Sequence, residues 1–510
     1  MAARVVTVAF QGVDAVRVDV EVQFTKGEAA FILVGLGDKA VAESRERVRA
    51  AFTGLGLAWP GKRIIANLAP ADLPKVGSHY DLPIALAVMA SMGVIPPDAL
   101  DGWAAVGELS LDGRIMPVAG ALPAAVAVGG MDLGLICPQA CGPEAAWAGD
   151  TRIIAAPSLI ALVNHFRGVQ ALSPPKPGEI LDGERGADLR EVKGQENAKR
   201  ALEIAAAGGH NLLFVGPPGS GKSMMAQRLP GLLPPLTPGE LLETSMVHSM
   251  AGLIAKGELR RARPFRSPHH SASMAALTGG GLKAKPGEVS LAHNGVLFLD
   301  ELPEFARGAV EALRQPLEER SVTIDRIHGA LKLPASFLLV AAANPCPCGW
   351  LHSNARECTC GPGAIERYQL RLSGPLLDRI DLQVYVQPVP LRELRHAGPG
   401  ESSAAIRARV AAARDRQLAR LKPWSLRCNA EMPSAVMRAT CKLDSAGERT
   451  LAQLVEQRRS FTARSVDRLI KVARTIADLV GQEDIDAGCL LEAASYRDSD
   501  PAADLAHHIA

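Results

Sequence analysis

The stretch NLLFVGPPGSGKS, residues 211–223, decides the fold of the chain around it. Its apolar part, Leu212–Val215, predicts a buried strand, and the helix-forming residues 224–229 predict a helix directly after the loop. The loop fits the phosphate-binding pattern G-x-x-x-x-G-K-S/T at every fixed position: Gly216, Pro217, Pro218, Gly219, Ser220, Gly221, Lys222 and Ser223. Backbone N–H groups and a helix N-terminus would face the phosphates there. We therefore expect a nucleotide, with Lys222 on its β- and γ-phosphates and the Ser223 hydroxyl on Mg²⁺.

Composition indicates a globular protein with more than one domain. The chain of 510 residues is too long for a single core, so about two to four domains are expected. The net charge of +2 creates no overall attraction to nucleic acid, so any such surface must be local. The longest apolar run, residues 82–96, is too short to span a bilayer, and we expect neither a signal peptide nor a membrane partner. Nine cysteines without a secretory signal indicate a reducing compartment, which predicts a cytoplasmic protein.

The first part of the chain, residues 1–170, predicts an α+β domain without a nucleotide motif. Apolar and polar residues alternate over residues 18–24, as in a half-buried strand. Further elements follow from the same patterns: strands at 64–68 and 115–118, a charged surface helix at 39–52 and a buried helix at 82–92.

Two segments of this region, PKVG (74–77) and GELSLDGRIMPV (107–118), resemble the proteolytic domain of Lon-type proteases, whose fold is like ribosomal protein S5 domain 2. Lon proteases work by a Ser–Lys pair, in which the lysine is the base for the hydroxyl. In this sequence the serine position falls on His79 and the lysine position on Leu122, which cannot take a proton. The resemblance therefore implies a scaffold or binding surface without protease activity. A shifted nucleophile at Ser78 is the alternative.

The proline-rich segment 171–187 predicts a stiff linker, and residues 188–207 an amphipathic helix leading into the phosphate-binding strand. Within the expected ATPase core, 188–390, a second apolar strand, Val296–Leu299, ends in two acids. This is the Walker B arrangement, in which Asp300 holds Mg²⁺ and Glu301 polarises the attacking water. A third predicted strand, 337–340, leads to Asn344, placed to contact the γ-phosphate and the water. A plain turn asparagine before Pro345 is the alternative.

Between the second and third strands, residues 321–333 predict two alternating strands around a turn near 328–329. A β-hairpin inserted at this point resembles a feature of ring ATPases that thread nucleic acid. Arg326, His328 and Lys332 are then the candidate DNA-binding residues. A solvated surface hairpin is the alternative for each of them.

Four cysteines follow in two C-x-C pairs: Cys346, Cys348, Cys358 and Cys360. Four thiolates suit tetrahedral Zn²⁺, which predicts a structural zinc site. His352 is a candidate replacement for one ligand, and four reduced structural cysteines are the alternative. Further on, RLSGPLLDRID (371–381) contains Arg379, our candidate for an arginine that reaches the neighbouring subunit's γ-phosphate. Its alternative role is a salt bridge to Asp378 or Asp381.

The chain resembles the magnesium-chelatase-like AAA+ ATPases in five segments taken together: the phosphate loop, VLFLDEL (296–302), NPCPCG (344–349), SGPLLDRID (373–381) and FRSPHHS (265–271). With VGLGDKAVAESRERVRAAF (34–52) and NLAPADLPKVGSHYDLPIALA (67–87) added, the chain is identified as a member of the ComM (YifB) family. The fold class is therefore α/β: an AAA+ core and a helical lid, 391–510, after the Lon-like domain. The resemblance also makes Arg464, which opens the lid helix 465–479, a second sensor of the nucleotide, acting within its subunit or across the interface.

For function, the family resemblance implies a hexameric ATPase that migrates branched DNA during natural transformation and homologous recombination. Its cofactors would be ATP, Mg²⁺ and structural Zn²⁺. Its partners would be its own copies in a homo-hexamer, single-stranded and branched DNA, and recombination proteins. Three alternatives stay open: a magnesium-chelatase ATPase subunit, a Lon-like protease, and a regulatory scaffold that uses ATP to bind a protein. In the helix 404–421, five arginines form either a solvated face or a nucleic-acid contact.

Overall fold

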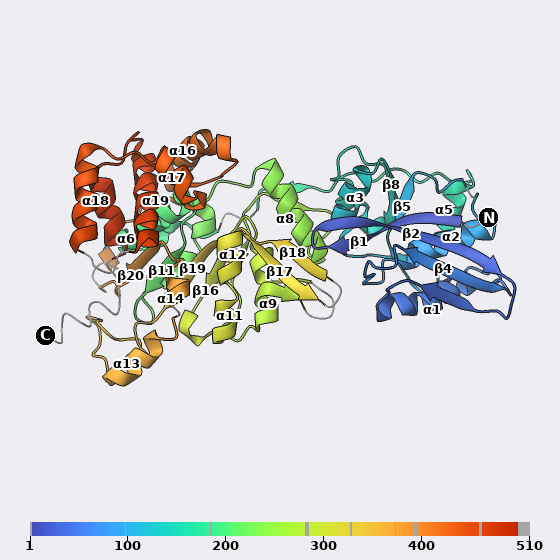
Figure 1. Ribbon diagram of the computed structural model, residues 1–510, viewed down its shortest axis with the longest axis horizontal. Coiled ribbons are helices and arrows are strands. Elements are labelled where there is room, and N and C mark those ends of the chain that lie inside the picture. Colours follow the sequence, from blue (N-terminus) through green and yellow to red (C-terminus); the bar gives the residue numbers. More distant parts are fainter. Residues whose placement is uncertain are drawn as a thin grey trace.

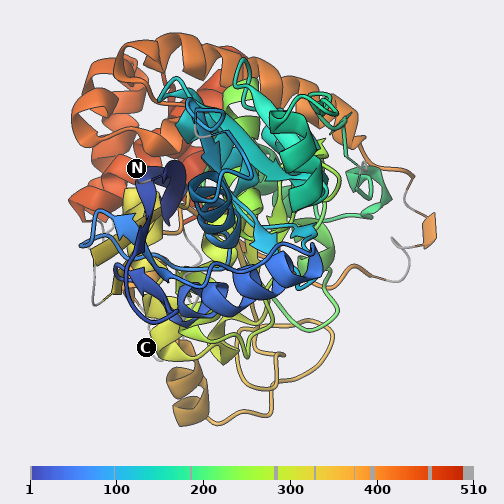
Figure 2. The same ribbon diagram turned by 90° about the vertical axis from the view of Figure 1, so that its right-hand side faces the viewer.

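The computed structural model describes residues 3–96, 98–183, 186–280, 285–326, 329–372, 374–390, 395–396, 398–457 and 462–497. Its elements form three parts along the long axis of the molecule (Figure 1): a mixed sheet with helices, a parallel sheet between helices, and a group of lid helices. Figure 2 looks onto the end formed by the first part, which covers the ATPase part behind it. None of the described helices is long and apolar enough to cross a bilayer.

The N-terminal part is built on a seven-stranded sheet of order β3-β4-β2-β1-β5-β8-β9. The alternation predicted at residues 18–24 is confirmed, since Val18, Val20 and Val22 are buried in β2. The strands are β1 (Ala3–Gln11), β2 (Asp14–Thr25), β3 (Phe31–Val34), β4 (Arg63–Ala69), β5 (Trp103–Ala105), β8 (Gly134–Pro138) and β9 (Ile153–Ala156). Around them lie a small hairpin, β6 (Glu108–Leu109) with β7 (Ile115–Met116), and the helices α1 (Lys39–Gly54), α2 (Asp81–Ser91), α3 (Ala121–Gly129), α4 (Gly142–Ala145) and α5 (Leu159–Phe166).

The ATPase part is a five-stranded parallel sheet of order β13-β16-β19-β11-β20. Its inner strands are apolar throughout because helices cover both faces, as is usual for parallel sheets. The strands are β11 (Leu212–Val215), β13 (Phe265–Arg266), β16 (Val296–Leu299), β19 (Leu338–Ala343) and β20 (Leu382–Tyr385). The helices are α6 (Glu196–Gly208), α7 (Lys222–Ala226), α8 (Pro238–Met250), α9 (Met274–Thr278), α10 (Glu288–Leu291), α11 (Arg307–Glu311), α12 (Arg314–Glu319), α13 (Pro362–Gln369) and α14 (Gly374–Leu377).

The predicted helix at 188–207 is wrong in its first turns. Only a short 3-10 turn, Leu189–Glu191, precedes α6, because Gly194 and Gln195 adopt left-handed backbone angles (φ 60° and 62°) that interrupt the helix. The preceding linker is not a free spacer along its whole length. Its residues Ile180–Leu181 (β10) pair in parallel with Leu259–Arg260 (β12) of the ATPase part.

The lid consists of α16 (Ser403–Leu421), α17 (Ser434–Thr440), α18 (Ser445–Gln457), α19 (Ala463–Val480) and α20 (Ala487–Ser495). Its buried residues share one core with α6 and with one face of the ATPase sheet. The arginines of α16, predicted as a solvated or DNA-binding face, make contacts within the chain, and Arg409 and Arg416 remain exposed. Arg420 pairs with the buried Asp478, Arg409 pairs with Glu203, and Arg414 donates to the Ala206 carbonyl.

The N-terminal part rests on the C-terminal end of α8. The Ser249 hydroxyl donates to the buried Glu144 carboxylate, and the Gly120 N–H donates to the Ser249 carbonyl over 3.1 Å. The Trp147 Nε1 donates to the Gly257 carbonyl over 2.8 Å. These bonds fix the first domain to the ATPase part at a helix that also packs against α10.

Candidate active site

Three neighbouring strands of the ATPase sheet bring the predicted nucleotide residues to one edge. The strands β11, β19 and β16 run parallel and adjacent, so their carboxyl ends lie side by side. The phosphate loop follows β11, Asp300 and Glu301 follow β16, and Asn344 follows β19. A cavity of about 420 Å³ at this edge is lined by Pro218, Gly219, Ser220, Gly221, Lys222, Ser223, Met224, Asp300, Glu301, Ala342, Ala343 and Asn344. The crevice beyond the carboxyl ends of the strands is the usual ligand site of such sheets.

The ammonium group of Lys222 lies folded into the phosphate loop. Its Nζ donates to the carbonyls of Gly216 (2.7 Å) and Pro217 (2.9 Å) and to the Asn344 Oδ1 (3.2 Å). Burial lowers the pKa of Lys222 to about 8, although the carboxylates of Asp300 and Glu301 oppose that shift. The loop can curl around a phosphate because Gly219 and Gly221 have φ of 74° and 93°, where a side chain would be strained.

The predicted Mg²⁺ ligands lie next to one another. The Ser223 Oγ donates to the Asp300 Oδ2 over 2.6 Å, so both oxygens face the same point of the cavity wall. A hard cation with oxygen ligands fits this pair, and the phosphates and waters would complete its shell. Glu301 is half exposed, and its carboxylate lies 3.6 Å from His270 Nδ1. This histidine belongs to the FRSPHHS motif and follows β13, the strand beside β16.

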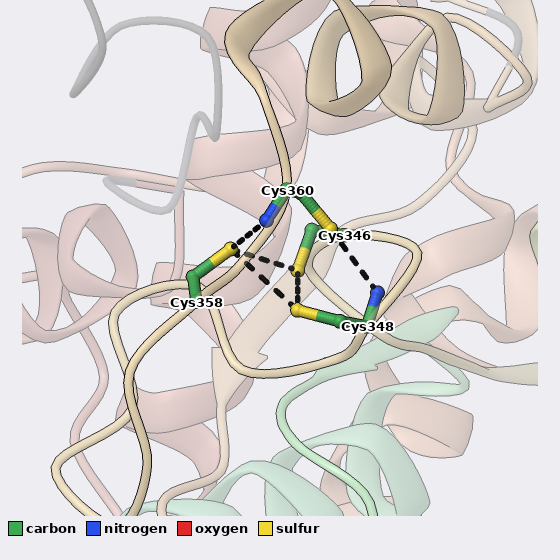
Figure 3. A group of neighbouring side chains, drawn as sticks. All are labelled: Cys346, Cys348, Cys358 and Cys360. Carbon is green, nitrogen blue, oxygen red and sulfur yellow. Dashed lines mark hydrogen bonds between the residues drawn. The ribbon is translucent and has the colours of Figure 1, made fainter.

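The structure brings the four clustered cysteines together (Figure 3). The Sγ of Cys346 lies 3.4 Å from that of Cys348 and 3.7 Å from that of Cys358, and all four sulfurs lie within 4.8 Å of one another. Four thiol sulfurs at this spacing fit a tetrahedral Zn²⁺ ion. Among the described residues this group contains the four cysteines alone, so it does not include His352.

The cysteine loop packs directly on the nucleotide site. A Cβ on Gly349 would lie 2.6 Å from Pro218 Cδ, so only glycine fits between the two loops. The other side of the cysteine loop is held by Tyr385, whose hydroxyl donates to the Leu351 carbonyl over 2.7 Å. Since Asn344 lies two residues before Cys346, the cysteines anchor the segment that carries it.

Arg379 lies at the opposite edge of the sheet from its own nucleotide cavity. It precedes β20, and its carbonyl accepts from Asn211 Nδ2 (2.9 Å) just before β11 begins. The four residues of β11 separate that edge from the phosphate loop by about 13 Å, at about 3.3 Å per residue. In the described part of the chain the guanidinium pairs with Glu318, not with the anticipated Asp378 or Asp381.

Arg464 is exposed in the first turn of α19 and does not line the cavity. One turn further, Arg468 Nε lies 3.9 Å from Asp381, which directly precedes β20. The start of α19 is therefore close to the same edge as Arg379. Neither arginine is among the residues that line the nucleotide cavity.

The predicted hairpin at 321–333 is confirmed as β17 (Ser321–Arg326) paired with β18 (Gly329–Pro334). Lys332 is exposed on it, whereas His328 and the side chain of Arg326 lie outside the described residues. The hairpin also meets the N-terminal domain, since a Cβ on Gly12 in the β1–β2 turn would lie 2.2 Å from the Lys332 carbonyl oxygen. Figure 1 shows the β17–β18 hairpin beside β1 of the N-terminal domain.

A second hairpin was not predicted. Its strands, β14 (Gly279–Gly280) and β15 (Lys285–Pro286), pair in antiparallel fashion. A Cβ on Gly279 would lie 3.2 Å from Ile324 Cδ1, so the two hairpins pack closely through Ile324 of β17. The glycine triplet 279–281 was the available signal, but without flanking apolar alternation it did not indicate strands.

The Lon-like positions of the N-terminal domain hold no Ser–Lys pair. The Ser78 hydroxyl donates to the Glu108 carboxylate, and the neighbouring Lys75 donates to the Pro70 carbonyl. Leu122 is fully buried, and its N–H donates to the Glu144 carboxylate over 3.2 Å. His79 is buried, and one of its ring nitrogens lies 2.9 Å from the Val8 carbonyl oxygen.

His79 should make the N-terminal domain acid-sensitive. Burial lowers its pKa to about 4, from an ordinary value of 6.5. A histidine kept neutral in the folded state contributes full stability above pH 6.5 and loses it as the pH falls toward 4, because the unfolded chain then binds a proton that the folded chain does not. Between pH 7 and pH 5 the loss should be about 2 kcal/mol.

Hydrogen exchange of the α2 amides at both pH values, corrected for intrinsic rates, measures this change. His79→Gln keeps a donor for the Val8 carbonyl and does not titrate, so its opening free energy should change less with pH. An equal pH dependence in both proteins would contradict the assignment.

Comparison with known proteins gives one consistent family. The profile for magnesium chelatase subunit ChlI matches residues 188–394, that for subunit ChlI of Mg-chelatase matches 20–140, and that for the ChlI C-terminal region matches 400–497. The chain is 44% identical to YifB of Escherichia coli over 95% of both chains, and 43% identical to competence protein ComM of Haemophilus influenzae over 96% of both. Over 36% of this chain and 37% of its own length, Lon protease 2 of Bacillus subtilis is 26% identical.

These matches agree with the phosphate loop, the Walker B acids and the Lon-like first domain described above. The family profiles indicate an ATPase. The residues predicted to bind nucleotide and Mg²⁺ lie together at one edge of the sheet. The chain therefore belongs to the ComM (YifB) family of magnesium-chelatase-like AAA+ ATPases.

Proposed function

We propose that this protein is an ATP-driven DNA motor that acts as a homo-hexamer and migrates branched DNA during natural transformation and homologous recombination. In this proposal the chain has four segments: the docked Lon-like domain (1–170), a linker (171–187), the core that hydrolyses ATP (188–390) and the lid (391–510). Recombination proteins are the expected further partners, and the cytoplasm, where DNA recombination occurs, is the expected compartment. The resemblance to competence protein ComM over nearly the whole chain supports the biological role.

The observation that carries the proposal is the division of the nucleotide site between two edges of one sheet. Lys222, Ser223, Asp300 and Glu301 lie at the carboxyl edge, whereas Arg379 lies at the amino edge of the same chain. A ring of copies joins the two edges, because each interface between identical subunits uses two different surfaces. We assign Glu301 the attacking water, Asn344 the γ-phosphate, and Arg379 and Arg464 the neighbour's nucleotide.

DNA is the proposed substrate of the hairpin β17–β18. Lys332 is exposed on this hairpin, which supports a role in contacting phosphates. The β1–β2 turn of the N-terminal domain abuts the same hairpin, so DNA there would touch two domains. Because the net charge is only +2, attraction to DNA must come from such local groups.

A labelled three- or four-stranded DNA junction tests the proposal. Purified protein with ATP and Mg²⁺ should convert the junction to exchanged products, and Lys222→Ala should not. A wild-type protein that hydrolyses ATP but leaves every junction unchanged would contradict the DNA role. It would favour the magnesium-chelatase-type subunit or the regulatory scaffold, which the family profiles also accommodate.

We further propose that Cys346, Cys348, Cys358 and Cys360 hold one structural Zn²⁺ ion. The mutual distances of their sulfurs support a tetrahedral site, and the packing of Gly349 on Pro218 would let the ion stiffen the nucleotide loops. Protein purified under reducing conditions should contain about one zinc per chain.

Cys358→Ser should lose this metal, whereas Cys489→Ser, a change at a buried thiol in α20, should keep it. Elemental analysis of both proteins measures the ratio. A folded wild-type protein without bound metal would show that the four cysteines are reduced structural residues.

A further inference from the structure

A cavity of about 870 Å³ lies beside the nucleotide cavity. Its walls come from the same two loops: Pro303 and Glu304 follow Glu301, and Pro347 follows Asn344. The two cavities therefore share the loops that follow Glu301 and Asn344.

Three arginines line the cavity and make it positively charged. Arg307 is the first residue of α11, Arg367 lies in α13, and Arg371 follows α13. Arg371 lies 3.3 Å from Glu304. Within the described residues, Arg307 and Arg367 have no ion pair, and both are exposed. The cavity thus carries uncompensated positive charge and fits an acidic partner.

The surface around Arg379 has the opposite character. Glu318 pairs with Arg379. The next residue, Glu319, is the last residue of α12. Asp378 is exposed directly before Arg379. One carboxylate, that of Glu318, therefore pairs with Arg379, and two more, Glu319 and Asp378, follow or precede these residues in the sequence.

We propose that the three-arginine cavity receives the acidic surface around Arg379 of a second copy of this chain, and so guides that arginine into the nucleotide site. The proposal rests on the ring of the proposed function. When Arg379 of the neighbour reaches toward Glu301, its companions Glu318, Glu319 and Asp378 arrive at the loops that line the cavity. Complementary charges at such a contact set the register of the two surfaces and speed their association.

Glu319 and Arg367 offer the cleanest test, because neither contacts the nucleotide cavity or Arg379 itself. Arg367→Glu and Glu319→Arg should each place like charges at every interface of the ring. The protein concentration at half-maximal ATPase rate per subunit should then rise by about tenfold or more. Arg49→Glu on the exposed face of α1 makes the same charge change as Arg367→Glu, so it is the matched control and should leave this concentration unchanged.

Mixing the two variants gives the decisive result. In an alternating ring each reversed cavity meets a reversed acidic surface, and each native cavity meets a native one. The equimolar mixture should therefore assemble and turn over ATP at lower concentrations than either variant alone, and the double variant should do the same. Higher salt should narrow these differences, because it screens exposed charges.

A mixture no better than its components, with both variants folded by circular dichroism, would overturn the proposal. So would single variants that behave like Arg49→Glu. These assays contain no DNA, so failure of junction migration alone would leave the interface intact and remove only the DNA role.

Discussion

Lys222→Ala should abolish ATP turnover, because the loop then lacks the cation that meets the β- and γ-phosphates. Its ammonium is already held over the loop by two carbonyls and Asn344. Among the described residues that line the cavity, no other side chain carries a positive charge. Glu301→Gln should behave differently. It keeps Asp300 and the phosphate loop, so ATP still binds, but removal of the group that polarises the water should slow hydrolysis by about 100-fold or more.

Turnover and equilibrium binding of a labelled ATP analogue separate these two effects. Lys62→Ala, a change at an exposed lysine of the N-terminal domain, serves as the control and should leave both quantities unchanged. A normal rate in either active-site variant would remove the roles assigned to Lys222 and Glu301. Loss of binding in Glu301→Gln would instead show that this carboxylate holds the Mg²⁺–nucleotide complex together.

Arg379→Ala should also be inactive, yet active sites should reappear when it is mixed with Lys222→Ala. The first variant contributes an intact phosphate loop, and the second an intact Arg379. Some interfaces in a mixed ring then combine both. An arginine that stabilises the transferring phosphoryl group contributes about a thousandfold or more to the rate, so the recovered turnover should stand far above either parent.

The recovered rate should depend on the mixing ratio and reach its maximum near equal amounts. Mass measurements that show mixed rings, together with no recovery of turnover, would mean that Arg379 acts within its own chain or only supports the fold. The position of Arg379 beside Asn211, at the far end of β11, is what predicts the recovery.

The sequence predicted the central sheet well because its strands carry local signals. Leu212–Val215 and Val296–Leu299 are uninterrupted apolar runs that end in functional residues, and buried parallel strands require such runs. The start of α6 was predicted too early. Two residues, Gly194 and Gln195, take left-handed angles there, and for a glutamine this choice depends on its tertiary bonds to Ser220 and Gln387.

Other features could not be predicted because they depend on contacts between distant segments. The pairing of Arg379 with Glu318 joins residues 61 positions apart, and His270 meets Glu301 only because β13 lies beside β16. The arginines of α16 gave no local sign that their partners, such as Asp478, lie in a later helix. The docking of α8 on Gly120 and Glu144 of the N-terminal domain likewise needs the three-dimensional arrangement of both domains.

The central claim is that ATP hydrolysis in this protein is coupled to branched DNA. The measurement that tests it most directly is the steady-state ATPase rate of the wild-type protein, titrated with a four-way junction and with a linear duplex of equal nucleotide content. We predict that the junction raises the rate more than the duplex does, and that Lys332→Glu on the β17–β18 hairpin reduces this stimulation. An ATPase rate that neither DNA changes, in a protein that forms rings and hydrolyses ATP, would contradict the account.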